Sequence, residues 1–165
     1  MQMINVVIDS VRKPEEDAFR FVVLKETDKE RYLAVPVRSD YGEFLVLSLE
    51  KTEQDKDAPL HLYDLLKELV DYGHLKIDRV VISNRKDSYY FAKIVVTASS
   101  IFSNRQKTIE CYAADALIIA VRTNAPIFVA ETLMAEAGLT PAEDSDKAWQ
   151  TTFLDIDEQL SAIFL

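Results

Sequence analysis

The stretch from Ala113 to Val129 reads AADALIIAVRTNAPIFV and decides the fold. Four apolar residues in it follow the i, i+3, i+4, i+7 spacing of one helix face, namely Ala114, Leu117, Ile118 and Val121. Alanine and isoleucine fill the other faces, so the segment Asp115–Val121 should be the most buried helix of the domain. A short strand at Pro126–Val129 is expected to follow it.

Three β-rich runs open the chain, at Asn5–Ser10, Phe19–Glu26 and Arg31–Val37. Charged segments separate them, which predicts an antiparallel meander. A serine and an aspartate resembling a helix N-cap come next, ahead of a long apolar run. We place a helix at Tyr41–Lys51 and expect it to be buried, because it is apolar nearly all round.

An amphipathic helix ending at Gly73 is predicted by the helical spacing of Leu62, Leu65, Leu66 and Leu69. Two β-rich runs follow, Leu75–Ser83 and Tyr89–Thr97, and five polar residues between them suit a hairpin loop. The buried helix should pack on the sheet that these runs form. We expect a polar loop over residues 98–107 and a short strand at Thr108–Tyr112.

The last part of the chain should contain two more helices. One is expected near Glu131–Ala137, and the other in the tail, where an apolar stripe combines Trp149, Phe153, Ile156, Leu160 and Ile163. The whole pattern predicts a single α+β domain with a mostly antiparallel twisted sheet, a buried central helix and flanking helices. Residues 1–140 would form its body, and residues 141–165 an acidic amphipathic C-terminal helix packed on the same domain.

Composition limits the classes of function. The chain has 165 residues, 3 glycines and a net charge of -9, of which the tail contributes six acids against one lysine. Acidity argues against wrapping duplex nucleic acid, and so few glycines leave no phosphate-cradling loop. Cys111 is the only cysteine, and no apolar run approaches the roughly 20 residues that cross a bilayer. We expect a cytoplasmic protein without a membrane partner or an organic cofactor.

Four stretches resemble the bifunctional nuclease domain family. They are Phe21–Glu26, Pro59–Leu66, Arg79–Ala92 and Asp115–Val129. The last is the most specific, because an Asp-Ala-aliphatic helix precedes an Arg-Thr-Asn-Ala-Pro-Ile turn and a strand. The resemblance implies a compact α+β fold, nuclease activity towards DNA and RNA, and a homo-oligomer, most simply a dimer. The apolar stripe of the tail or an exposed sheet edge would support that assembly.

The chain departs from the family pattern at two places. Tyr63 stands where the family usually has a histidine, so Asp64 alone carries over from that motif. An Arg-Pro-Ser triplet usually precedes the aspartate of the buried helix, but here the residues before Asp115 are Tyr112-Ala113-Ala114. The family pattern also has a glutamate after a Pro-Ile strand. Its counterpart in this chain would be Glu43, with Asp40 as the competitor.

Asp115, Asp64 and Glu43 are the candidate catalytic residues, and each is expected in the first turn of a helix. A nuclease would use converging carboxylates to hold Mg²⁺ or Mn²⁺. The same acids could simply cap helix N-termini. Arg122 and Thr123 are candidate phosphate-binding residues, with helix termination as the alternative.

Other side chains carry weaker signals. His61 and His74 flank one helix and suit terminal positions better than a metal site. The aromatic run Tyr89–Phe91 could stack on bases, although hairpin aromatics more often pack a core. Two functions therefore stand: a metal-assisted nuclease acting on DNA or RNA, or a non-catalytic binding or assembly module that retains the fold.

Overall fold

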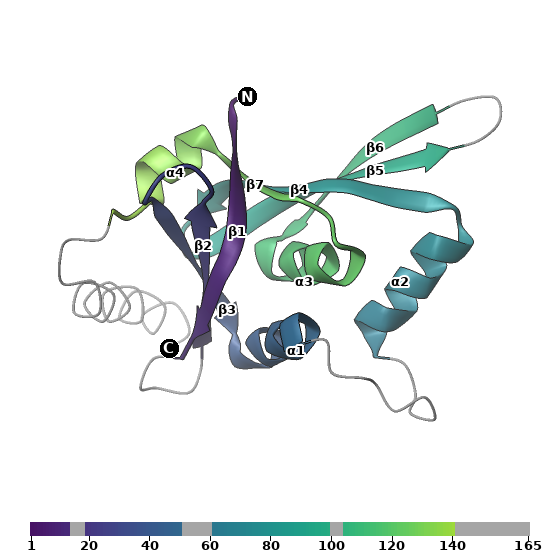
Figure 1. The fold of residues 1–165 in the computed structure, drawn as a ribbon, viewed down its shortest axis with the longest axis horizontal. Helices are drawn as coiled ribbons and strands as arrows, with labels where there is room; N and C mark the ends of the chain where they lie inside the picture. The colour runs from purple at the N-terminus through teal and green to yellow at the C-terminus, as the bar shows by residue number, and fades with distance from the viewer. Residues whose placement is uncertain (14–18, 51–60, 100–103, 141–165) are drawn as a thin grey trace.

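A computed structural model of the protein describes residues 1–13, 19–50, 61–99 and 104–140. These residues form a single α+β domain, in which helices pack against a curled, mostly antiparallel sheet (Figure 1). The strands are β1 Met3–Arg12, β2 Phe19–Glu26, β3 Tyr32–Arg38, β4 Leu75–Lys86, β5 Tyr89–Ser99, β6 Asn104–Tyr112 and β7 Ile127–Ala130. The helices are α1 Ser39–Glu50, α2 Leu62–Tyr72, α3 Ala113–Thr123 and α4 Glu131–Ala137.

The sheet joins two antiparallel units through one short strand. Its strand order is β3-β2-β1-β7-β4-β5-β6, so the predicted opening meander forms one half and the later hairpin with β6 the other. Strand β7 pairs antiparallel with β1, where Ile4 lies opposite Val129, and parallel with β4, where Val80 lies opposite Ile127. The last strand in the described chain is therefore internal to the sheet.

Helix α3 is the most buried helix, as its all-round apolar surface predicts. Ala116, Leu117 and Ile118 have almost no exposed surface, and the helix packs on β4 and β5. Helices α1 and α2 lie on the same side of the sheet and flank α3 (Figure 1). The three helices bring residues far apart in the sequence to one region above the sheet.

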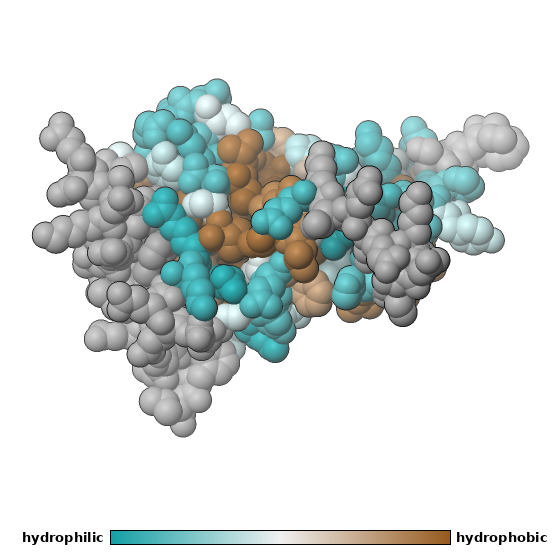
Figure 2. Space-filling view, turned by 60° about the horizontal axis from the view of Figure 1, so that its bottom comes forward, coloured by the Kyte–Doolittle hydropathy of each residue, from teal (hydrophilic) through white to brown (hydrophobic). Residues whose placement is uncertain are grey.

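Helix α1 is less buried than its sequence predicts, and that expectation was wrong. Leu45 is buried, but Leu47 and Leu49 are exposed, because only one side of α1 packs against α3 and β2. Figure 2 shows the side of the molecule where α1 lies in Figure 1, and apolar side chains gather at its centre. An apolar run of this length thus leaves part of its surface in water.

The hairpin and its third strand also differ from the prediction. The turn between β4 and β5 has only two residues, Asp87 and Ser88, and Asp87 takes a φ of 56°. Aspartate tolerates this left-handed conformation better than most residues. Strand β6 begins at Asn104, so much of the polar loop predicted over residues 98–107 is strand. Pairing with β5 stabilises this strand although its polar composition favours a loop.

Helix α2 turns its apolar row away from the protein. Tyr63, Asp64 and Lys67 lie on its inner side, although the helix is strongly amphipathic. The outer row is between 36% and 88% exposed and consists of Leu62, Leu65, Leu66, Leu69 and Tyr72, continued by Leu75 at the start of β4. We call these six residues the α2 apolar row.

None of the helices in the described ranges has the length and apolar character needed to span a bilayer. The predicted tail helix, with its stripe from Trp149 to Ile163, lies outside the described residues.

Candidate functional site

Two polar contacts join α2 to α3, and both involve candidate site residues. The Tyr63 hydroxyl donates a hydrogen bond of 2.6 Å to Oδ1 of Asp115. In the second contact, Nη1 of Arg122 donates a hydrogen bond to Oδ1 of Asp64. Asp115 and Arg122 are seven residues apart and so share one face of α3, opposite the adjacent pair on α2. The contacts bring together four residues from two separate stretches of the family resemblance.

Tyr63 is held in its protonated form. Burial raises the pKa of its hydroxyl above the ordinary value of a tyrosine, and the hydrogen bond to the Asp115 carboxylate raises it further. The hydroxyl can therefore orient Asp115 by donating its proton in a hydrogen bond. It cannot take a proton from water, as a histidine at this position could.

Asp64 and Arg122 form a partly buried ion pair. Their side chains are 11% and 22% exposed, and Asp64 is among the few buried charged residues of the described chain. Removing one partner of such a pair leaves an uncompensated charge in a poorly solvated place. The pair therefore fixes α2 against α3.

Glu43 is placed elsewhere. It is the fifth residue of α1, not a first-turn residue as predicted, because the helix begins at Ser39. Its Oε1 accepts a hydrogen bond of 3.0 Å from Arg20, whose side chain also packs against Gly42. Its competitor Asp40 does lie in the first turn, where it pairs with Arg38 at 2.8 Å. In the described ranges, no three His, Cys, Asp or Glu side chains come together as a group suited to a metal ion.

The C-terminal end of α3 has ordinary helix-ending contacts. The Thr123 hydroxyl donates a 2.7 Å hydrogen bond to the carbonyl oxygen of Ile119. Asn124 follows in the left-handed conformation, which ends many helices. These contacts agree with the helix-termination role for Thr123. His61 and His74 likewise lie at the two ends of α2, as expected.

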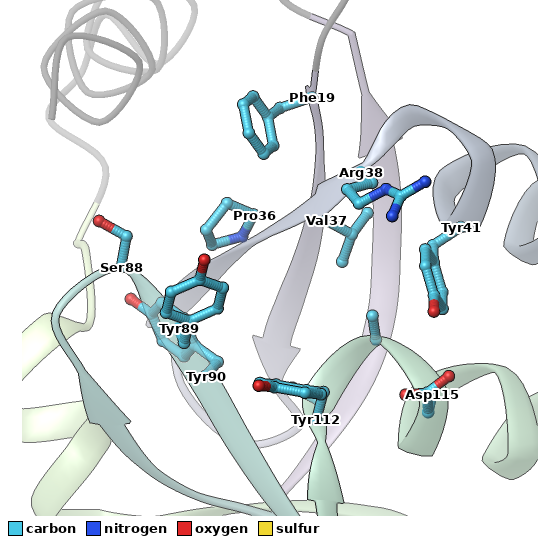
Figure 3. Close-up of a pocket in the computed structure, with 12 residues that line it drawn as sticks. Phe19, Pro36, Val37, Arg38, Tyr41, Ser88, Tyr89, Tyr90, Tyr112 and Asp115 are labelled. Atoms are coloured by element: carbon cyan, nitrogen blue, oxygen red, sulfur yellow. The ribbon is translucent and has the colours of Figure 1, made fainter. Parts of the chain in front are cut away.

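A cavity of about 330 Å³ opens beside Asp115 (Figure 3). Four separate segments border it: the start of β2, the end of β3 with the start of α1, the β4–β5 turn with the start of β5, and the junction of β6 with α3. Its lining is rich in aromatic residues, namely Phe19, Tyr41, Tyr89, Tyr90 and Tyr112. Arg38 and Asp115 supply the charges, and Figure 3 shows Tyr41 between them.

The aromatic side chains support one another. The Tyr112 ring stacks on Phe91 with a centroid separation of 5.4 Å and an interplanar angle of 29°. Tyr89 lies 5.9 Å from Tyr112, at 49°. On the other side, the Arg38 guanidinium lies over the Tyr41 ring, 5.8 Å from its centroid. Both Tyr89 and Tyr112 keep a large exposed surface.

Sequence reasoning missed three residues of this cavity: Arg38, Tyr41 and Tyr112. Arg38 and Tyr112 are the last residues of their strands before α1 and α3, and Tyr41 lies in the first turn of α1. Side chains at such junctions often line sites, and that was the available signal. No spacing rule brings β3, the β4–β5 turn and β6 to one place.

Cys111 directly precedes the cavity residue Tyr112 on β6 and is partly buried. Burial raises the pKa of its thiol to about 11, and the neighbouring Asp115 charge contributes. The thiol is therefore protonated at neutral pH and is a poor nucleophile.

Comparison with known proteins finds a matching family model and similar sequences. A family model described as "Bifunctional nuclease domain" matches residues 22–142. The uncharacterized protein MT1877 of Mycobacterium tuberculosis strain CDC 1551 / Oshkosh is 27% identical over 159 residues, covering 96% of this chain and 88% of the relative. The uncharacterized protein Rv1829 of strain ATCC 25618 / H37Rv of the same species matches with the same identity and coverage.

Proposed function

This chain belongs to the bifunctional nuclease domain family, and on that premise we propose that it hydrolyses phosphodiester bonds of DNA or RNA beside Asp115. The observation that carries the proposal is the position of Asp115. This acid lies in the most specific stretch of the family resemblance and borders an aromatic cavity large enough for a nucleotide-sized group.

Asp115 would act through its carboxylate on the water that attacks phosphorus, and Tyr63 would position it. The 2.6 Å hydrogen bond from Tyr63 restricts the carboxylate to one orientation. A positioned carboxylate can orient and deprotonate water, a contribution worth about 10²–10⁴-fold in general base catalysis. Tyr63 is then a positioning residue, because its hydroxyl keeps its proton.

Among the candidate carboxylates, Asp115 fits a divalent cation best. Mg²⁺ is usually held by one or two carboxylates together with water and substrate phosphate oxygens, so a three-residue cluster is not required. Bound Mg²⁺ or Mn²⁺ would neutralise phosphate charge and make water more acidic. Ligand roles for Asp64 and Glu43 stay predictions, and each of these carboxylates has an arginine partner. Phosphate binding by Arg122 and Thr123 also stays a prediction.

A second function, a non-catalytic binding or assembly module, is favoured by one observation. Tyr63 replaces the histidine that the family usually has, and it contacts the retained Asp115 directly. If water activation needs that histidine, the aromatic cavity would bind nucleic acid without cleaving it.

We also infer that the protein assembles as a dimer through the α2 apolar row. The six exposed side chains present on the order of 600 Å² of apolar surface, at the upper limit of the largest patch on a typical monomer. A standard interface buries about 800 Å² per partner. A second copy of the chain is the occupant that fits, because a straight helical row can pack against its own symmetry mate about a twofold axis.

The exposed edge strand β6 is a weaker interface candidate than the α2 apolar row. It carries Arg105, Lys107 and Glu110, and charged side chains protect sheet edges from pairing.

The nuclease proposal is tested by incubating highly purified protein with labelled DNA and with labelled RNA, in Mg²⁺, in Mn²⁺ and in EDTA. We expect cleavage that depends on the added metal ion. Substrates that stay intact under every metal condition, at the level of the EDTA reaction, would reject catalysis and favour the binding module.

A further inference from the structure

The cavity beside Asp115 has the features of a site for an unpaired base. Two of its tyrosines remain well exposed even though the region is apolar: Tyr89 is 41% exposed and Tyr112 is 53% exposed. Figure 3 shows both rings on one side of the cavity, with Asp115 and Tyr41 on the other. The volume of about 330 Å³ lies at the lower end of the range for small-ligand pockets.

The Tyr112 ring is positioned so that a base could stack on it. Phe91 packs behind its ring at 5.4 Å, and Tyr89 leans towards it at 49°, so the ring is held in place while much of its surface remains in water. Stacking a base on a fixed aromatic ring costs little side-chain entropy. Such stacking is tolerant of base identity because every base has a π-face.

The positively charged side chain of Arg38 lies across the cavity from these rings. The Arg38 side chain is 70% exposed and is paired with Asp40, itself a surface residue, so its guanidinium remains accessible to a ligand. Guanidinium groups bind phosphate oxygens through paired N–H donors. The cavity thus offers an aromatic surface for a base and a cation for the adjoining phosphate, next to the carboxylate of Asp115.

We propose that this cavity takes one unpaired base of a nucleic-acid strand, stacked on Tyr112 and Tyr89, with its phosphate at Arg38. The inference deepens the proposed function and rests on it, because it names single-stranded DNA or RNA as the substrate class of the same site. A base inside a duplex is already paired and stacked, and reaching a pocket would require flipping it out at a cost of a few kcal/mol.

The test measures binding without cleavage. A fluorescein-labelled DNA strand of about 20 nucleotides without self-complementarity is titrated with protein in EDTA, and fluorescence anisotropy reports binding; the RNA strand and the DNA duplex of the same sequence are titrated in parallel. We expect the single strands to bind at least about tenfold more tightly than the duplex. The double variant Tyr89→Leu/Tyr112→Leu should lose about tenfold or more in affinity for the single strand.

The matched control keeps the rings and removes only the hydroxyls. Tyr89→Phe/Tyr112→Phe should bind within about twofold of wild type, which separates ring stacking from a general structural effect. Near-ultraviolet circular dichroism and melting confirm that each variant is folded. Equal binding of strand and duplex, wild-type affinity in the folded leucine variant, or no binding by the wild type would each overturn the inference.

Cleavage is measured separately on the same proteins, so the two proposals can fail independently. Ring-dependent strand binding without any metal-dependent cleavage would leave the base site standing and reject the nuclease. Cleavage that persists in a leucine variant with unchanged strand affinity would support the nuclease and reject the base site.

Discussion

The Tyr63 hydroxyl donates a 2.6 Å hydrogen bond to Asp115, so the residue that replaces the family's usual histidine contacts the acid that is retained. The two residues come from separate helices, α2 and α3, and the bond between them forms next to the Asp64–Arg122 ion pair. A change of residue type at position 63 therefore acts directly on the candidate catalytic carboxylate.

Asp115→Asn should abolish most metal-dependent cleavage while the protein stays folded. The amide neither accepts a proton nor binds a divalent cation well, and loss of a general base alone costs about 10²–10⁴-fold. Cleavage of labelled single-stranded RNA and DNA is compared with the melting temperature. Glu136→Gln, a surface residue of α4 paired with Arg85, serves as the control with wild-type cleavage. Wild-type rates in folded Asp115→Asn would reject this site.

Tyr63→Phe should lower the free energy of unfolding by about 1–3 kcal/mol at neutral pH, because the Asp115 carboxylate loses its donor. The pKa of Tyr63 is raised in the folded protein, so the unfolded chain ionises first as pH increases. Its stabilising contribution is present below about pH 10 and is lost above it. Urea unfolding at about pH 8 and about pH 11 should show a smaller alkaline loss in the variant. An identical loss in both proteins would contradict the role of Tyr63.

Cys111 should react slowly with iodoacetamide at about pH 8, since its pKa of about 11 keeps the thiol protonated. It is the only cysteine, so mass spectrometry of the intact protein follows its alkylation without ambiguity. Asp115→Asn removes a neighbouring negative charge and should speed the reaction. The protein in urea gives the rate of an unshifted thiol. A native rate equal to the rate in urea would contradict the burial of Cys111.

The Asp64–Arg122 pair should show strong coupling in a double-mutant cycle. Arg122→Leu removes the ion-pair partner of the poorly solvated Asp64 carboxylate and should cost about 3–5 kcal/mol of unfolding free energy. The double variant Asp64→Leu/Arg122→Leu should cost clearly less than the sum of the single changes, because it removes both charges of the pair together.

The ion pair between Arg20 and Glu43, in which the glutamate side chain is exposed, supplies the comparison for this cycle. Glu43→Gln removes its charge at the surface and should change the unfolding free energy by less than about 1 kcal/mol. Additive single and double changes at positions 64 and 122 would show that the two side chains do not stabilise each other.

Leu65→Glu/Leu69→Glu should convert a dimer into a monomer. Both side chains lie in the α2 apolar row, and burying two carboxylates in an interface is costly. Light scattering is expected to give about twice 18.8 kDa for the wild type and 18.8 kDa for the variant. Val7→Glu, which changes an exposed apolar residue of β1, should leave the dimer intact. A wild-type mass of 18.8 kDa at high micromolar concentration would rule out the assembly.

Sequence patterns were sufficient where the physical cause is local. The all-round apolar surface of α3 predicted its burial, and β-rich runs predicted the opening meander. The leucine spacing of α2 predicted a helix, but amphipathicity does not say which side faces the protein. Here Asp115 and Arg122 on α3 attract the polar side of α2, and the leucines remain in water.

The candidate site was predictable only in part, for a related reason. Asp115, Asp64 and Arg122 stood out because they lie at helix ends within matched stretches. Arg38 did not, because it comes near Asp115 only when β3 packs beside α3. Tyr112 directly precedes α3 in the sequence, but only the fold brings the Tyr89 ring beside it. The ion pair of Glu43 with Arg20 likewise depends on the packing of α1 on β2.

The central position of β7 has a consequence for how the protein is made. Residues 127–130 are the last strand of the described sheet to leave the ribosome, yet they connect the unit of β1, β2 and β3 to the unit of β4, β5 and β6. During synthesis each unit can form its own hairpins. The backbone groups along the inner edges, β1 and β4, stay unpaired until β7 is available. The nascent chain is therefore most exposed to wrong strand pairing just before Ile127 leaves the ribosome.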